Sequence, residues 1–313
     1  MGPSVLVTGG SGFIGRALVA RLRQEGARVE VADLVPHPDH RQPCVVGDLR
    51  HPGTLAAALH PGTETVFHLA AMTSVLGSIH HPAEVYETNV ALTAHLVERA
   101  RQLGVHRVVL ASTNAVVGGG RSEEGSGPAA GAPITEASPL RPLTPYGGSK
   151  AAAEMVLSAY AGAYGMATNA VRLTNVYGPG MGGKDSLVAR VMRAALSDAQ
   201  VLVYGDGAQV RDYLYVDDAV QALYLAAQSP TPGPVVAGSG RSTSVLELVD
   251  AARRATGRSI PAKHVDAPAG EMPAVVVDIA RAGGLGFQPK VDLDRGLAET
   301  WADFLAREGG DHR

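Results

Sequence analysis

Cysteine is almost absent from this sequence: Cys44 is the single one among 313 residues. An intrachain disulfide is therefore excluded, which fits a reducing compartment. Cys44 opens the apolar run CVVGDL, and this context indicates a core position rather than a nucleophile. The histidines are scattered without the spacing of zinc ligands, so no metal site is expected.

Long apolar runs and blocks of like charge are also missing. No stretch approaches the roughly 18 uninterrupted apolar residues of a membrane span. The N-terminus MGPSVLVTGG lacks the charged and apolar regions of a signal peptide. The net charge is -3 with acidic and basic residues interspersed, which argues against a nucleic-acid partner. These absences predict a cytoplasmic protein with neither a membrane nor a nucleic-acid partner.

Short apolar runs alternate with helical patterns over the first two thirds of the chain. Runs typical of strands are residues 5–10, 28–34, 44–49, 65–71, 107–113 and 168–176, and helical patterns include residues 14–26, 89–104 and 151–165. Such alternation predicts βαβ units and an α/β fold, a Rossmann-type doubly wound parallel sheet. The near-continuous apolar strands favour helices on both faces of the sheet.

Glycines cluster where the first expected strand turns into the first helix. The stretch VLVTGGSGFIGRAL contains Gly10-x-Gly12-x-x-Gly15. Glycine permits a tight turn there and a close approach of the backbone to a pyrophosphate, which the helix N-terminus also attracts. Asp33 ends the second strand 18 residues after Gly15, where a carboxylate accepts ribose hydroxyls and repels a 2′-phosphate. This arrangement favours NAD over NADP; the alternative for Asp33 is a turn residue.

Two further signals concern the edge of the sheet and the few lysines. Asp48 also ends a strand and is a candidate contact for the adenine amino group, with Leu49 beside it.

Only four lysines accompany 23 arginines, and Lys150 follows Tyr146 by four residues in TPYGGSK, on the same helical face. A unit positive charge ~4 Å from the phenol, worth roughly 4 kcal/mol, predicts a tyrosine pKa near neutrality. Alone, the pair is common by chance, and its spacing then favours ordinary surface neighbours on a helix.

Taken together, these segments resemble the extended short-chain dehydrogenase/reductase family, in particular its nucleotide-sugar epimerase branch. The matching stretches are TGGSGFIG (8–15), GDL (47–49), HLAA (68–71), STNAVVG (112–118), YGGSK (146–150), RLTNVYGPG (172–180) and RDYLYVDDAV (211–220). They span most of the chain in the family's order. The resemblance implies NAD as cofactor, a nucleotide sugar as substrate and a homodimer.

The resemblance also implies a role for individual residues. Tyr146 resembles the family's acid/base, Lys150 its partner, and Thr113 and Ser112 the hydroxyls beside it; strand-end capping is an equal alternative for Ser112. The implied cofactor contacts are Gly9, Gly12, Phe13, Ile14, Gly15, Asp33, Asp48, Leu49, Leu69, Ala70, Ala71, Asn89, Tyr146 and Lys150. The implied substrate contacts are Thr73, Thr113, Asn175, Leu187, Leu202, Tyr204 and Arg211.

The expected domains follow from these assignments. Residues 1–174 are predicted to form the NAD-binding Rossmann domain, to which residues 212–238 return as a helix (217–228) and a strand (234–238). Residues 175–211 and 239–313 are predicted to form a smaller α/β substrate-binding domain. The Gly-, Ser- and Pro-rich stretch 118–133 is expected to be a loop, either a lid or a surface insertion.

The residues after Thr113 favour an epimerase over a dehydratase. Resembling dehydratases carry an Asp-Glu pair there, whereas this chain has Asn114 and Ala115. Without an additional acid/base pair, the expected outcome is inversion of one stereocentre by a nucleotide-sugar 4-epimerase. The alternatives are a nucleotide-sugar reductase, another NAD-dependent alcohol oxidoreductase, and a non-catalytic NAD-binding scaffold.

Departures from the family pattern leave the sugar open. An arginine common in UDP-sugar relatives is replaced by Pro268, so a diphosphate contact has to come from elsewhere, with Arg281 and Lys184 as candidates. Relatives acting on hexuronates often place an arginine where this chain has Leu76. UDP-hexose and UDP-hexuronate both remain possible substrates.

The expected homodimer rests on two helices, the one after Asn89 and the one carrying Tyr146. In the resembling family these helices form a four-helix interface. Here they carry more apolar residues than one buried face needs: Leu92, Leu96, Met155, Val156 and Tyr160.

Overall fold

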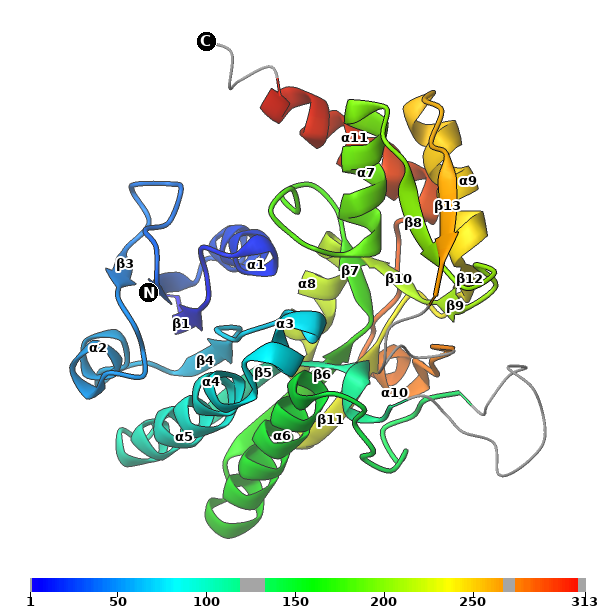
Figure 1. The fold of residues 1–313 in the computed structure, drawn as a ribbon. Coiled ribbons are helices and arrows are strands. Elements are labelled where there is room, and N and C mark those ends of the chain that lie inside the picture. Colours follow the sequence, from blue (N-terminus) through cyan, green and yellow to red (C-terminus); the bar gives the residue numbers. More distant parts are fainter. Residues whose placement is uncertain (1, 119–132, 267–273, 309–313) are drawn as a thin grey trace.

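A parallel sheet forms the centre of the computed structural model, which describes residues 2–118, 133–266 and 274–308 (Figure 1). The seven strands follow the order β11 (Gly233–Ala237), β6 (Ala167–Leu173), β5 (Arg107–Thr113), β4 (Thr65–His68), β1 (Ser4–Thr8), β2 (Arg28–Asp33) and β3 (Cys44–Val46). All neighbouring strands are parallel. The strand order reverses between β1 and β4, and ligands bind open sheets at the carboxyl ends of strands beside such a point.

Helices cover both faces of this sheet. One face carries α1 (Phe13–Gln24), α8 (Val216–Ala226) and α10 (Ala280–Gly284), and the other carries α2 (Pro52–Ala58), α5 (Leu92–Gln102) and α6 (Pro145–Tyr164). Val5 and Val7 of β1 pack with the first group, and Leu6 packs with the second. This alternation is the period of two that a strand imposes. The predicted doubly wound α/β fold is confirmed.

The chain returns to the sheet after leaving it. Strand β11 pairs with β6, and α8 packs beside α1, in the segments where the sequence predicts this return. Helix α10 also packs against β11, and Ala282 joins the same apolar cluster, although the prediction assigns residues 239–313 to the other unit. The domain boundaries themselves stay a prediction.

A further apolar core lies at one end of the sheet, in a smaller unit of the chain. It is built by the helices α7 (Leu187–Ser197), α9 (Val245–Thr256) and α11 (Leu293–Glu308). Three strand pairs accompany them: β8 (Val201–Tyr204) with β13 (Ala262–Val265), β9 (Val210–Arg211) with β12 (Thr243–Ser244), and β7 (Asn175–Tyr177) with β10 (Tyr213–Tyr215). Phe13 of α1 belongs to this core, so the start of the first helix contacts the smaller unit.

Two predicted elements differ from those observed. The strand expected at residues 168–176 divides: the Thr174 N–H still donates to the Ala237 carbonyl beside β11, whereas the Asn175 N–H donates to the Asp212 carbonyl and β7 pairs with β10. The helix expected to begin at Asn89 starts earlier, because α4 (Pro82–Tyr86) runs through a π-helical turn η1 (Glu87–Ala91) into α5. A separate short helix, α3 (Val75–His80), precedes it and ends at the non-helical His81. Residues 119–132 of the predicted loop lie outside the described residues.

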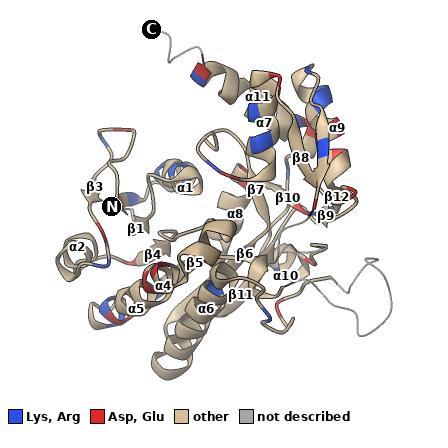
Figure 2. Cartoon of the chain, viewed as in Figure 1, with Lys and Arg blue, Asp and Glu red and all other residues tan. Residues whose placement is uncertain are grey.

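Charged residues lie on outer helices such as α5, α7 and α9, whereas the central strands carry few (Figure 2). This distribution is that of a core sheet covered by solvated helices. Within the described ranges, no helix has the length and hydropathy needed to cross a membrane.

Candidate active site

A cavity of about 950 Å³ lies at the carboxyl ends of the central strands and is bordered by both units. The cofactor, catalytic and substrate residues implied by the family resemblance all line this cavity except Asn89. The sheet edge, the start of α1, the start of α6 and the loops of the smaller unit therefore converge on one space.

The turn from β1 into α1 requires glycine at two positions. Gly9 has a φ of 70°, and a Cβ there would lie 2.7 Å from the Ala70 nitrogen. A Cβ on Gly15 would lie 2.1 Å from the Gly9 carbonyl oxygen. Gly12 is the N-cap of α1, and no side chain caps this helix. The first N–H groups of α1 are thus left for a ligand, and phosphate is the anion that such a helix start binds.

The two acidic residues at neighbouring strand ends are held differently. Asp33 Oδ2 accepts a hydrogen bond from the Ser11 N–H at 2.9 Å, which orients this carboxylate beside the glycine turn. Asp48 is engaged by Arg50, with Nη2 to Oδ2 at 2.7 Å and Nε to Oδ1 at 3.1 Å. The same guanidinium lowers the pKa of Asp48. The predicted adenine contact of Asp48 is untested, and its carboxylate is shared with Arg50.

Asn89 is buried behind the cavity and holds a segment that lines it. Its Oδ1 accepts from the Met72 N–H at 2.9 Å, and its Nδ2 donates to the Met72 carbonyl at 3.0 Å. Nδ2 also donates to Ser149 Oγ at 2.9 Å, and the Ser149 hydroxyl donates to the Tyr146 carbonyl at 2.8 Å. Asn89 therefore ties the segment after β4 to the first turn of α6.

His68 extends this network to β1. Its Nδ1 lies 2.7 Å from Thr8 Oγ1, and its Nε2 lies 3.1 Å from Thr93 Oγ1. Because the Thr93 hydroxyl donates to the Asn89 carbonyl, Nε2 carries the proton and donates to Thr93. Burial, together with the charge of Lys150, lowers the pKa of His68 to about 3, so the ring is neutral.

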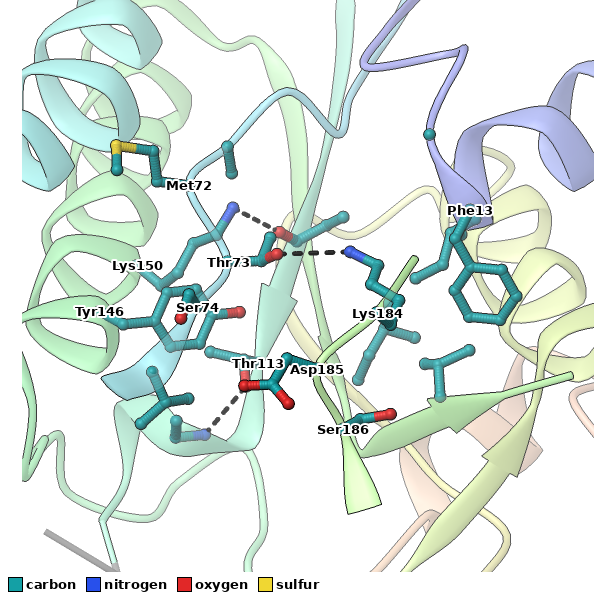
Figure 3. A pocket seen from close by; sticks show the side chains of 18 of the residues that line it. Phe13, Met72, Thr73, Ser74, Thr113, Tyr146, Lys150, Lys184, Asp185 and Ser186 are labelled. Atoms are coloured by element: carbon teal, nitrogen blue, oxygen red, sulfur yellow. Dashed lines mark hydrogen bonds between the residues drawn. The ribbon is translucent and has the colours of Figure 1, made fainter. Parts of the chain in front are cut away.

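Tyr146 and Lys150 lie in the first two turns of α6 because that helix begins just before them. Thr144 is the N-cap, its hydroxyl accepts from the Gly147 N–H, and Pro145 occupies the first helical position. Both functional side chains are buried, and Lys150 Nζ donates to the Ala111 carbonyl at 2.8 Å (Figure 3).

The pKa of Tyr146 differs from the expectation. Burial raises it to about 12, and a hydrogen bond with the Thr113 side chain offsets part of this effect. Burial also lowers the pKa of Lys150 to about 8, while the Glu154 carboxylate acts in the opposite direction. The prediction of a near-neutral phenol is wrong for the protein groups alone, because it included charge attraction and left out desolvation.

Ser112 lines the cavity, but its hydroxyl donates to Glu154 Oε1 at 2.5 Å. Glu154 forms a buried ion pair with Arg172 at 2.8 Å, and Arg172 lies opposite Ser112 in the register of β5 and β6. This arrangement gives the Ser112 hydroxyl a structural partner that differs from the strand-end capping considered above. It leaves Thr113 as the hydroxyl hydrogen-bonded to Tyr146.

The expected substrate residues come mostly from the smaller unit. Leu187, Leu202, Tyr204 and Arg211 line the cavity from α7, β8 and β9, and Asn175 lines it from β7. The Arg211 guanidinium donates to the Val210 carbonyl at 2.8 Å, and Asn175 Nδ2 donates to the Asp212 carbonyl at 3.0 Å.

Of the two candidates for the missing diphosphate contact, Lys184 and Arg281, one lines the cavity and the other does not. Lys184 lines the cavity, with Nζ 3.4 Å from Thr73 Oγ1. Arg281 lies on α10, is not among the lining residues, and donates to the Pro232 carbonyl at 3.2 Å. Pro268 lies outside the described residues.

Comparison with known proteins settles the family. Residues 5–238 match the family described as NAD dependent epimerase/dehydratase. The chain belongs to this family. A UDP-glucose 4-epimerase of Mycolicibacterium smegmatis is 34% identical, with 94% of this chain and 96% of the relative covered. A dTDP-glucose 4,6-dehydratase of Streptomyces griseus is 33% identical, with 95% and 93% covered.

Solved structures agree with this membership. MoeE5 in complex with UDP-glucuronic acid and NAD is 36% identical, with a TM-score of 0.87 and 97% of this chain and 99% of that chain covered. MoeE5 has also been solved with UDP-glucose and NAD. As a member of the NAD-dependent epimerase/dehydratase family, the protein is an enzyme with NAD as its cofactor.

Within this family frame, sequence analysis leaves several supporting residues unidentified. Glu154 follows Lys150 by four residues, and this spacing places the two side chains on the same face of a helix, so the sequence could have indicated their interaction. Arg172 and His68 stand inside recognised motifs, yet nothing in their type or spacing shows their hydrogen-bond partners. Those partners come from distant segments and appear only when the strands are aligned in space.

Proposed function

We propose that this enzyme is a UDP-sugar 4-epimerase in which Tyr146 acts as the acid/base. The observation that carries this proposal is the joint position of Tyr146, Thr113 and Lys150, buried at the carboxyl end of β5 and bordering the cavity that the glycine turn also lines. The names of the similar epimerases and the UDP-sugars bound to MoeE5 support the same substrate class.

The residues at the start of α1 fit NAD. The uncapped helix start and its glycines hold the pyrophosphate, and Asp33 accepts the adenosine ribose hydroxyls. Lys150 offers donors to the second ribose. Bound NAD supplies the hydride acceptor and donor that oxidation and reduction at C4 require.

Tyr146 moves the proton at the C4 oxygen. With a pKa of about 12, Tyr146 is almost entirely protonated at neutral pH and cannot accept a proton, so proton removal depends on nearby positive charge that lowers this pKa, from Lys150 and from the oxidised cofactor. Thr113 shares a hydrogen bond with the phenol and can contact the same substrate oxygen. Returning the proton to that oxygen completes the inversion, and no further acid/base group is needed.

The positions after Thr113 support inversion rather than water loss. Asn114 and Ala115 have no acidic group to remove a second proton or to protonate a leaving hydroxyl. The dehydratase among the relatives makes this distinction the one to test.

The deciding experiment is incubation with UDP-glucose, UDP-glucuronic acid and TDP-glucose without added cofactor, followed by product separation and mass measurement. An epimerase yields products of unchanged mass. Loss of one water would identify a dehydratase, and a requirement for free NAD or NADH would identify a net oxidoreductase.

The nucleotide is assigned to the smaller unit. Arg211 and Asn175 hold the diphosphate, Tyr204, Leu187 and Leu202 flank the base, and Thr73 contacts the sugar. A guanidinium suits phosphate oxygens because its N–H groups form a planar fork.

We also propose a homodimer through α5 and α6, although fewer apolar residues of these helices are exposed than the sequence suggests. Leu92 and Leu96 are 2% and 0% exposed and pack into the core of the chain itself, so they do not contribute surplus apolar surface. Met155 is 51% exposed, and Val156 and Tyr160 are half-buried. The molar mass in solution at micromolar concentration tests this assembly.

A further inference from the structure

We call the part of the cavity lined by Tyr146, Lys150 and Thr113 its reacting end. Lys184 approaches this end from the side opposite Tyr146 and Lys150 (Figure 3). Its Nζ lies 3.4 Å from Thr73 Oγ1. Thr73 directly follows Met72, which Asn89 and Ser149 connect to the backbone of Tyr146. The contact therefore places this ammonium beside the segment that is fixed to the catalytic helix.

The backbone that carries Lys184 is held from two helices. Arg193 of α7 donates from Nη1 to the carbonyls of Gly182 and Lys184 at 3.0 and 2.9 Å. Arg16 of α1 donates to the Gly180 carbonyl at 3.0 Å. A side chain on so constrained a loop is pre-organised, and its position does not have to be ordered when a ligand binds.

The positive charge of Lys184 lacks an acidic partner. Its neighbour Asp185 is engaged by Arg190 at 2.6 and 2.9 Å. Over residues 2–118, 133–266 and 274–308, no ion pair involves Lys184. The side chain is half-buried, and burial lowers its pKa. A desolvated cation without a counter-charge is unfavourable, so this position suits an anionic group of a ligand.

The reacting end determines which anion fits. If Tyr146 acts at C4 of the sugar, the group on C5 is the next substituent along the ring, and in a hexuronate that group is the C6 carboxylate. The diphosphate is assigned to Arg211 and Asn175, on strands β9 and β7 of the smaller unit. We propose that Lys184 binds the C6 carboxylate of a UDP-hexuronate and selects this substrate over a UDP-hexose. This inference rests on the proposed 4-epimerase function.

The test compares Lys184→Met and Lys184→Arg with the wild type and with Lys263→Met, a matched control on an exposed position of β13 outside the cavity. Calorimetry measures the affinity of the NAD-loaded enzyme for UDP-glucuronic acid, UDP-glucose and UDP. A charged hydrogen bond corresponds to about a 10- to 100-fold change in affinity. The preference for UDP-glucuronic acid over UDP-glucose should fall by this factor in Lys184→Met, be partly restored in Lys184→Arg, and be unchanged in Lys263→Met.

Each other outcome overturns the inference. An equal loss of affinity for both sugars and for UDP would assign Lys184 to a phosphate. A loss of bound NAD would assign Lys184 to the cofactor. An unchanged preference for UDP-glucuronic acid over UDP-glucose would show that Lys184 does not bind the carboxylate. Turnover is measured separately: absence of epimerisation in the wild type defeats the proposed function, whereas the affinity ratio decides the role of Lys184.

Discussion

The two ends of the cavity are built in contrasting ways. At the reacting end, Thr113 comes from the seven-residue strand β5 of the central sheet and Tyr146 and Lys150 come from α6. Hydrogen bonds from Lys150, His68 and Asn89 fix this region. At the nucleotide end the side chains come largely from two-stranded sheets; β9 has two residues, and Leu202 is 49% exposed. In the proposed function, the chemistry that needs fixed geometry is thus assigned to the rigid element, and nucleotide recognition is assigned largely to short strands.

The largest expected effect is a loss of turnover from a substitution that changes the reacting end alone. Tyr146→Phe removes the phenolic proton acceptor and keeps the ring, so kcat should fall about 10²- to 10⁴-fold while NAD remains bound. Steady-state kinetics and the absorbance of released NAD measure the two quantities.

Tyr160→Phe is the matched control on the same helix. Tyr160 donates to Glu98 and does not line the cavity, so its variant should keep normal turnover. Near-normal activity of Tyr146→Phe would remove Tyr146 from the mechanism.

The second effect concerns the rigidity of the reacting end. Arg172→Met leaves Glu154 buried without its ion-pair partner, and breaking such a pair costs about 3–5 kcal/mol of unfolding free energy. Urea denaturation measures this change. Arg101→Met, which breaks the more exposed pair with Glu98, should shift the midpoint far less. Equal shifts in the two variants would show that burial of the Arg172 pair is not what stabilises α6.

The third effect breaks the nucleotide end. Arg211→Ala should raise the KM for a UDP-sugar roughly 10- to 100-fold with NAD content unchanged, since a phosphate loses a charged donor. Inhibition by free UDP should weaken by the same factor. If KM changes but UDP inhibition does not, Arg211 contacts something other than the diphosphate.

The same contrast explains how far sequence reasoning reaches. The glycine turn, Asp33 and the Tyr146–Lys150 pair are local patterns, and their predicted positions on one cavity agree with the structure. The hydroxyl of Ser112 and the pKa of Tyr146 depend on Glu154 and on burial, which are properties of packed tertiary structure. Sequence spacing gives no measure of desolvation, so the direction of that pKa shift was not accessible from it.

The fourth effect lies at the cofactor side of the cavity. Asp33→Ala removes the expected ribose acceptor and the charge that repels a 2′-phosphate, so the affinity ratio of NAD to NADP should fall about tenfold. Fluorescence titration of cofactor-free enzyme with both dinucleotides measures this ratio. An unchanged ratio would assign Asp33 to the Ser11 turn alone.

The smallest effect at neutral pH is a pH dependence that belongs to the reacting end. Burial lowers the pKa of Lys150 to about 8, so its ammonium is present below that pH and is lost as pH rises through it. If the proton transfer of Tyr146 needs this charge, kcat should be halved near pH 8 and fall about tenfold for each further pH unit. Glu154 raises the pKa of Lys150, so Glu154→Gln should move this limb to lower pH, whereas Glu98→Gln on α5 should leave it in place. Rate profiles from pH 6 to about 10 for the three proteins measure this alkaline limb. If Glu154→Gln does not shift the limb, the group that titrates is not Lys150.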